Sequence, residues 1–130
     1  MTSDIRHQIA DFIMHNFEKL VFWQKSIELA KQVYIICAEL PKDEKFGLIS
    51  QIKRSVISIP SNIAEGYGRQ STQNYIQFIK IARGSLCELE TQLLVAKKLD
   101  FINDEELFSE LTNHIIEENK MINSFLNKLR

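Results

Sequence analysis

The chain has 130 residues, 45% of them hydrophobic and 25% charged, and its 16 Lys and Arg residues nearly balance 17 Asp and Glu residues. These values fit one folded domain and exclude a disordered chain. Four Gly and two Pro are too few for a turn-rich β fold, and two Cys cannot form a disulfide scaffold, so we expect a reducing, cytoplasmic compartment. No apolar run reaches the length of a membrane span, so we expect no membrane association.

Charge is distributed unevenly along the chain. Residues 42–98 carry nine basic and five acidic side chains, a net charge of +4, whereas residues 99–130 carry three basic and seven acidic ones, a net charge of −4. The plainer interpretation is two solvated faces of different sign. The alternatives are a basic surface for a polyanion, or two opposite patches that mediate self-association.

The apolar spacing predicts a first long helix over residues 21–40. Its apolar positions are Trp23, Ile27, Ala30, Tyr34 and Cys37 and, beside them, Phe22, Leu29, Val33, Ile36 and Leu40. They follow one another at intervals of three and four residues, which is the period of an amphipathic helix. We expect the helix to end at Pro41, because a proline forces the preceding residue out of the α region.

A second helix is predicted over residues 43–66, where acidic side chains follow Pro41 and suit the positive end of a helix dipole. Isoleucine and valine then recur at helical spacing, at Ile49, Ile52, Val56, Ile59 and Ile63. Gly66 and Gly68 follow, and glycine tolerates the left-handed conformation that ends many helices. The helix is therefore expected to end in this glycine pair.

Two further helices are predicted over residues 71–98 and 103–129. Ser71 is a plausible N-cap for the third, and Asn103 with Glu106 three residues later resembles a capping box for the fourth. Gly84 lies inside the third helix, where glycine costs about 1 kcal/mol relative to alanine. We expect the close approach of another backbone to compensate for that cost.

Four helices of similar length with short links predict an all-α, antiparallel, up-down-up-down four-helix bundle. The bundle is expected to span residues 17–130. Residues 1–16 form an N-terminal extension, and the spacing of Ile5, Ile9, Phe12 and Ile13 predicts a short helix there. This extension is expected to dock on the bundle or on a neighbouring chain.

A polar seam runs along the second predicted helix. Gln51, Ser55, Ser58, Asn62, Glu65 and Arg69 follow one another at intervals of three and four residues. A solvated face is one interpretation; an inter-helix or inter-subunit polar network is the preferred one, because solvated faces are usually richer in Lys and Glu. The candidate network comprises Gln51, Ser55, Ser58, Asn62, Glu65, Arg83 and Glu88, and Arg83 is expected to pair with Glu65 or Glu88.

No constellation for catalysis or metal binding is visible in the sequence. His114 lies four residues from Glu110, but no second helix repeats such a pair, as di-iron bundles require. The phosphate-loop, Cys-x-x-Cys and nucleophile-elbow motifs are absent. We therefore predict no catalytic residues, metal, cofactor or small-molecule substrate, and we interpret Cys37, Cys87 and Trp23 as core residues.

Several stretches together resemble a known family. The opening motifs are residues 22–25 (FWQK), 40–41 (LP), 46–48 (FGL) and 51–54 (QIKR), and the longest are residues 58–69 (SIPSNIAEGYGR) and 81–93 (IARGSLCELETQL). Over about residues 17–130 the chain resembles the bacterial four-helix-bundle family named for proteins encoded in intervening sequences of 23S ribosomal RNA genes. The resemblance implies an antiparallel four-helix bundle that assembles into a homopentamer.

The same resemblance implies distant relatives that are accessory proteins of diversity-generating retroelements. Those relatives are strongly basic and work with a reverse transcriptase and its RNA, whereas this chain has a net charge of −1. Affinity for a polyanion comes mostly from neutralised phosphates, and a net charge of +4 on residues 42–98 supplies few.

Two hypotheses for the function remain. The first is a non-catalytic, self-assembling bundle that acts as a scaffold or adaptor. The second is an accessory factor that binds RNA, or an RNA-binding protein, through a basic face of the second and third helices. Its candidate contacts are Lys53, Arg54, Arg69, Lys80 and Arg83. A shared exposed face would favour the second hypothesis, and arginines engaged with carboxylates would favour the first.

Overall fold

The computed structural model describes residues 20–69 and 71–129. The helix expected in residues 1–16 lies outside this part of the chain. The elements are α2 (Val21–Cys37), a short 3₁₀ helix η2 (Lys42–Glu44), α3 (Leu48–Tyr67), α4 (Thr72–Lys98) and α5 (Glu105–Leu129). The all-α class and the four-helix bundle are confirmed, and the described residues contain no strand.

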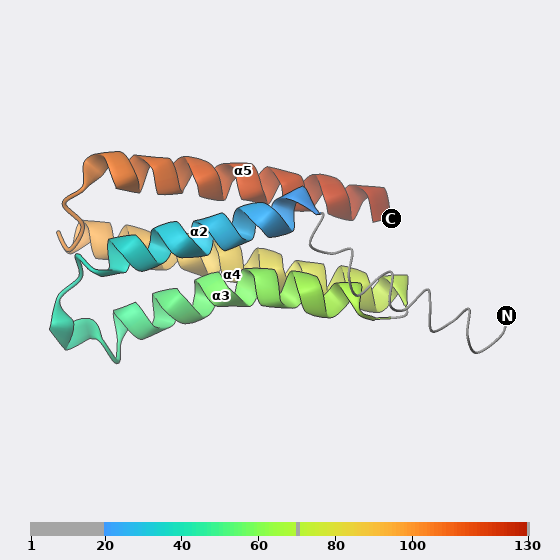
Figure 1. The fold of residues 1–130 in the computed structure, drawn as a ribbon, viewed down its shortest axis with the longest axis horizontal. Helices are drawn as coiled ribbons and strands as arrows, with labels where there is room; N and C mark the ends of the chain where they lie inside the picture. Colours follow the sequence, from blue (N-terminus) through green and yellow to red (C-terminus); the bar gives the residue numbers. More distant parts are fainter. Residues whose placement is uncertain (1–19, 70, 130) are drawn as a thin grey trace, which may run out of the picture.

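The four long helices run alternately up and down, and the α2–α3 and α4–α5 connections lie at the same end of the bundle (Figure 1). α2 packs against α3 and α5, and α4 packs against the same two helices. α2 and α4 therefore lie diagonally opposite, as do α3 and α5. This square arrangement leaves four outer faces, each formed by two neighbouring helices.

The core is a continuous cluster of aliphatic side chains from all four helices. Its largest fully buried members are Leu29, Ile36, Ile52, Ile59, Ile63, Ile79, Leu86, Leu89, Ile102, Leu111, Ile122 and Leu126. Each such side chain contributes about 1.5–3 kcal/mol when it is removed from water, so burial of this face is the main force that holds the helices together.

The boundaries of the first two helices differ from the prediction. α2 ends at Cys37 and not at residue 40, because the N–H groups of Ala38, Glu39 and Leu40 bond to carbonyls three residues earlier, which tightens the chain into turns before Pro41. α3 begins at Leu48 and not at residue 43. Glu44 ends the 3₁₀ turn, and its carboxylate accepts the N–H of Leu48 at 3.1 Å, which helps to satisfy the start of α3.

The N-cap of α4 was predicted correctly, and that of α5 was not. Ser71 Oγ accepts the N–H of Asn74 at 3.1 Å, as expected for an N-cap. In α5 the cap is Asp104, whose Oδ1 accepts the N–H of Leu107 at 3.0 Å, and not Asn103. The carboxylate of Glu39 accepts the N–H groups of Asn103 and Asp104, so it ties the end of α2 to the start of α5.

α3 ends at Tyr67, between Gly66 and Gly68, as predicted, but the reasons expected for the glycines differ from those found. Gly68 ends α3 with a φ of −80°, in the right-handed region. Gly66 is needed for packing, because a Cβ atom there would lie 2.7 Å from the Cβ of Phe78 on α4. Gly84, in contrast, has no atom within 4 Å of its added Cβ, so the expected backbone approach does not occur within the chain.

Some residues assigned to the core are exposed. Ile27 is 42% and Tyr34 is 45% exposed, because this stripe of α2 lies beside the core-facing side chains and not over them. Cys87 is exposed on α4, whereas Cys37 is buried, as predicted. Trp23 is half-buried and packs against the edge of the core.

Candidate interaction surfaces

The polar seam of α3 contributes a small hydrogen-bonded group between α3 and α4. Ser58 Oγ lies 2.8 Å from Ser85 Oγ, and Asn62 Nδ2 donates to both the backbone carbonyl and the hydroxyl of Ser58, each at 2.8 Å. With Gly66 placed against Phe78, these small side chains allow α3 and α4 to pack closely. The structure thus brings Ser58 and Asn62 together, with Ser85 as a partner that the sequence reasoning missed.

The other members of the predicted network lie apart. Glu65 is paired with Arg69, which lies just beyond the end of α3. Arg83 donates to Asn123 Oδ1 on α5 at 2.9 Å, so it does not form the expected ion pair with Glu65 or Glu88. Gln51 and Glu88 are exposed, and Ser55 is buried.

The five candidate nucleic-acid contacts do not form one basic face. Lys53 lies over the ring of Tyr34 on the α2/α3 side, 4.7 Å from its centroid. Arg69 is bound to Glu65 and stacks on Phe78, and Arg83 is bound to α5. Arg54 and Lys80 are exposed on α3 and α4. Arg69 is thus engaged with a carboxylate, whereas Arg83 is engaged with an amide oxygen.

An exposed apolar surface lies between α2 and α3. We call it the α2/α3 patch and define it as Ile27, Lys31 and Tyr34 of α2 with Lys53 and Ile57 of α3. Its α2 members are three and four residues apart and share one helix face, and Ile57 lies one turn from Lys53. Ile57 is 44% exposed, which is similar to the exposure of Ile27 and Tyr34. The patch combines three large apolar side chains with two lysines and no carboxylate.

A hollow of about 390 Å³ lies at the α2–α3 connection, next to the patch. Its lining residues are Tyr34, Cys37, Ala38, Leu40, Lys42, Lys45, Ile49 and Lys53. Burial raises the pKa of the Cys37 thiol, which keeps it protonated and unreactive. Three lysines around a largely apolar floor favour an anionic group with an apolar body.

The opposite side of α2 carries a polar hollow of about 320 Å³, which we call the α2/α5 hollow. It is lined by Lys25, Gln32, Glu110, Asn113, His114 and Glu117. Lys25 Nζ lies 2.9 Å from Glu117 Oε1, and this bond lowers the pKa of Glu117. His114 Nδ1 lies 2.8 Å from Gln32 Oε1, and desolvation and Lys25 lower its pKa, so the ring is neutral at pH 7.

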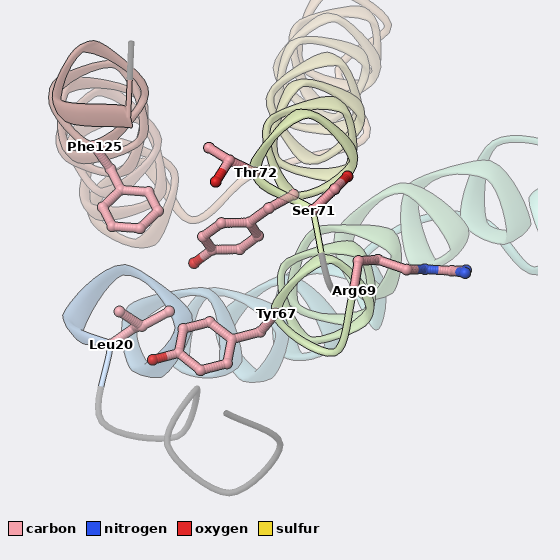
Figure 2. Close-up of a pocket in the computed structure, with 7 residues that line it drawn as sticks. Leu20, Tyr67, Arg69, Ser71, Thr72 and Phe125 are labelled. Atoms are coloured by element: carbon pink, nitrogen blue, oxygen red, sulfur yellow. The ribbon is translucent and has the colours of Figure 1, made fainter. Parts of the chain in front are cut away.

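A third hollow, of about 330 Å³, lies at the end of the bundle where α2 begins (Figure 2). Tyr67 and Phe125 face it from α3 and α5, whereas the side chain of Arg69 points away. Tyr75 also lines it and makes edge contacts with both aromatic rings. Burial raises the pKa of the Tyr75 hydroxyl, which therefore stays protonated.

Among the described residues, Glu118 is the one charged side chain that is fully buried. Its side chain is 0% exposed in α5, and neither carboxylate oxygen has a hydrogen-bond partner. Desolvation raises its pKa to about 8, with Lys25 lowering and Glu117 raising it to smaller extents. The carboxyl is therefore mostly protonated at pH 7.

In residues 20–69 and 71–129, no three His, Cys, Asp or Glu side chains are grouped so that they could hold a metal ion. Within the same part of the chain, every helix is too short or too polar to cross a bilayer.

The sequence pattern of the 23S rRNA-intervening sequence proteins matches residues 18–124, which cover the bundle nearly from end to end. The chain belongs to the 23S rRNA-intervening sequence protein family. It is the family that the motifs at residues 58–69 and 81–93 resemble. Comparison with curated proteins gives no match.

A solved structure has the same fold as this 23S rRNA-intervening sequence protein. It is described as a protein of unknown function from the S23 ribosomal protein family, from Bacteroides thetaiotaomicron. The two chains are 30% identical, with a TM-score of 0.74, and the match covers 82% of this chain and 98% of the other. The shared structure is the bundle, and the function of that relative is also unknown.

Proposed function

We propose that this chain is a non-catalytic bundle that assembles with copies of itself and acts as a scaffold or adaptor. The α2/α3 patch is the observation that carries the proposal. Single exposed apolar side chains are ordinary on protein surfaces, but grouped ones mark sites of contact. Here three exposed apolar side chains lie on two helices that pack together, and Lys53 stacks on Tyr34.

A ring of five subunits is the form of assembly that the family resemblance implies. A ring requires a contact between two different surfaces of the same chain. The opposite net charges of residues 42–98 and 99–130 support such a contact. The hydrogen bonds of Ser58, Asn62 and Ser85 are satisfied between α3 and α4, so the proposal assigns the main subunit contact to the apolar patch and not to this group.

Substitution within the patch tests the proposal. Ile57→Glu places a charge in the proposed contact, and we expect the molar mass measured by light scattering to fall toward that of one chain. Leu94→Glu is the matched control, because Leu94 is a similarly exposed residue of α4 outside the patch. Equal assembly of wild type and Ile57→Glu would exclude the patch as the contact.

The absence of catalysis is part of the proposal. Among the described residues, no hydrogen bond joins a nucleophile to a base, and many of the polar contacts lie in helix caps, in the α3–α4 contact or in surface ion pairs. Hydrolase and transferase screens with purified protein test this part, and turnover that disappears with a single point substitution would contradict it.

Binding of RNA is a second candidate, and one observation favours it. Lys42, Lys45 and Lys53 surround the hollow beside Tyr34, and Lys45 also lies over the exposed ring of Phe46. Lysines next to exposed aromatic rings are typical of surfaces that bind single-stranded nucleic acid. Such a role needs a cytoplasmic location, which we also propose.

So few lysines predict weak RNA binding that depends steeply on salt. Three phosphate contacts give a slope of about −2 in log K against log salt, because each contact to a single strand contributes roughly −0.7. Fluorescence anisotropy with a labelled single-stranded RNA at increasing salt measures the slope. Tight binding that persists at about 0.5 M salt would require a larger basic surface than these three lysines provide.

A further inference from the structure

We propose that the α2/α3 patch of one copy docks on the α2/α5 hollow of a second copy, with Lys31 entering the hollow beside Glu110. The inference rests on the proposed self-assembly and names the two surfaces that meet. It goes beyond the family resemblance, which gives a number of subunits and no contact surfaces.

Lys31 is placed to enter a partner. It is exposed, and it lies between Ile27 and Tyr34 on the same face of α2, four residues after one and three before the other. Among the described residues, Lys31 pairs with no carboxylate. A cation in the middle of an apolar surface is stabilised when a carboxylate of the partner meets it.

The α2/α5 hollow offers that carboxylate. Glu117 is already engaged by Lys25, whereas Glu110 pairs with no cation in residues 20–69 and 71–129. Because His114 is neutral at pH 7, Glu110 is the unpaired charge among the residues that line the hollow, and the nearby carboxylate of Glu28 adds negative charge. Ile35 is 56% exposed and lies three residues beyond Gln32, so it shares a helix face with this lining residue.

The positions of the two surfaces favour a closed ring. They lie on neighbouring sides of the square bundle, because α2 contributes to both and contacts both α3 and α5. Contacts through two faces at roughly a right angle turn each copy by about a quarter turn relative to the last. Such an arrangement closes after about four copies, close to the five that the family resemblance implies, whereas contacts through opposite faces would extend into a filament.

Charge reversal in full-length protein tests this contact. Lys31→Glu places two carboxylates together at every contact, and Glu110→Lys places two ammonium groups together. We expect each single variant to associate at least about tenfold more weakly than wild type in sedimentation equilibrium, because like charges oppose each other across an interface. The double variant Lys31→Glu/Glu110→Lys restores one opposite pair at every contact, so association should recover.

Matched controls are Lys80→Glu and Glu90→Lys, which reverse exposed charges on α4, the helix diagonal to α2. Both should associate as wild type does, and circular dichroism should show the same helicity for all variants. If the wild type associates and both single variants associate equally well, the docking of the patch on the hollow is overturned, but self-assembly is not. Recovery in the double variant would support it, and failure to recover would contradict it. A monomeric wild type would overturn the proposed self-assembly itself.

Discussion

At the scale of single residues, Glu118 has the least favourable environment in the bundle. An unpaired carboxyl in an apolar core costs free energy in either form, and the ionised form costs much more. Its folded-state pKa of about 8 lies above the ordinary value of 4.5. The folded protein thus keeps a proton that the unfolded chain releases, so the associated stability is complete below about pH 4.5 and is lost as pH rises toward 8.

This environment predicts a pH dependence that one substitution removes. In wild type, the free energy of unfolding from urea titrations should fall by a few kcal/mol between pH 5 and 8, at about 1.4 kcal/mol per unit of pKa shift. Glu118→Met fills the same space without a polar group, and it should be more stable than wild type at pH 8 and show little of this slope. Glu90→Gln on the surface is the control. A wild-type curve as flat as that of Glu118→Met would contradict the buried, protonated carboxyl.

Two glycines provide a matched pair of predictions. Gly66→Ala adds a Cβ 2.7 Å from the Cβ of Phe78, so it should destabilise the protein by about 1–3 kcal/mol although alanine favours the helix. Gly84→Ala adds a Cβ to open space within the same chain, so it should stabilise the fold by about 0.5–1 kcal/mol. Thermal unfolding of both variants measures the difference, and the opposite order would show that α3 and α4 do not pack as described.

At the scale of helices, the caps determine where each element begins. Ser71→Ala removes the acceptor for the N–H of Asn74 and should cost about 1 kcal/mol in the free energy of unfolding. Ser109→Ala lies on an exposed face inside α5 and should be neutral or slightly stabilising, because alanine favours helix. Chemical denaturation of the two variants provides the comparison. Equal stability of the two would remove the role given to the Ser71 cap.

The sequence could predict that a helix begins or ends near a given residue. It could not decide which of two adjacent residues forms the cap. Ser71 is recognisable because no other cap-forming side chain precedes α4 so closely. Asn103 and Asp104 are both good N-caps, and only the position of α5 relative to Glu39 distinguishes them. Likewise, Pro41 marks the end of the first helical segment, but the turns that end α2 three residues earlier depend on packing at Leu40.

At the scale of the whole molecule, the bundle follows from four amphipathic segments, but its outer surfaces do not. Ile27 and Tyr34 continue the apolar stripe of α2, and only the packing of the four helices leaves them half exposed. Glu118 lies at helical spacing between Ile115 and Ile122, so the apolar pattern of α5 places it on the buried face, although its immediate neighbours in the sequence are polar. The scattering of Arg69 and Arg83 over separate faces also depends on tertiary contacts with Phe78 and Asn123.

The molar mass of the wild-type protein in solution shows whether it assembles with copies of itself. One chain has a mass of 15.2 kDa. Sedimentation equilibrium at micromolar concentration should give a multiple of this value, five for the ring that the family resemblance implies, and the multiple should persist on moderate dilution. A mass of 15.2 kDa at every concentration would contradict the account.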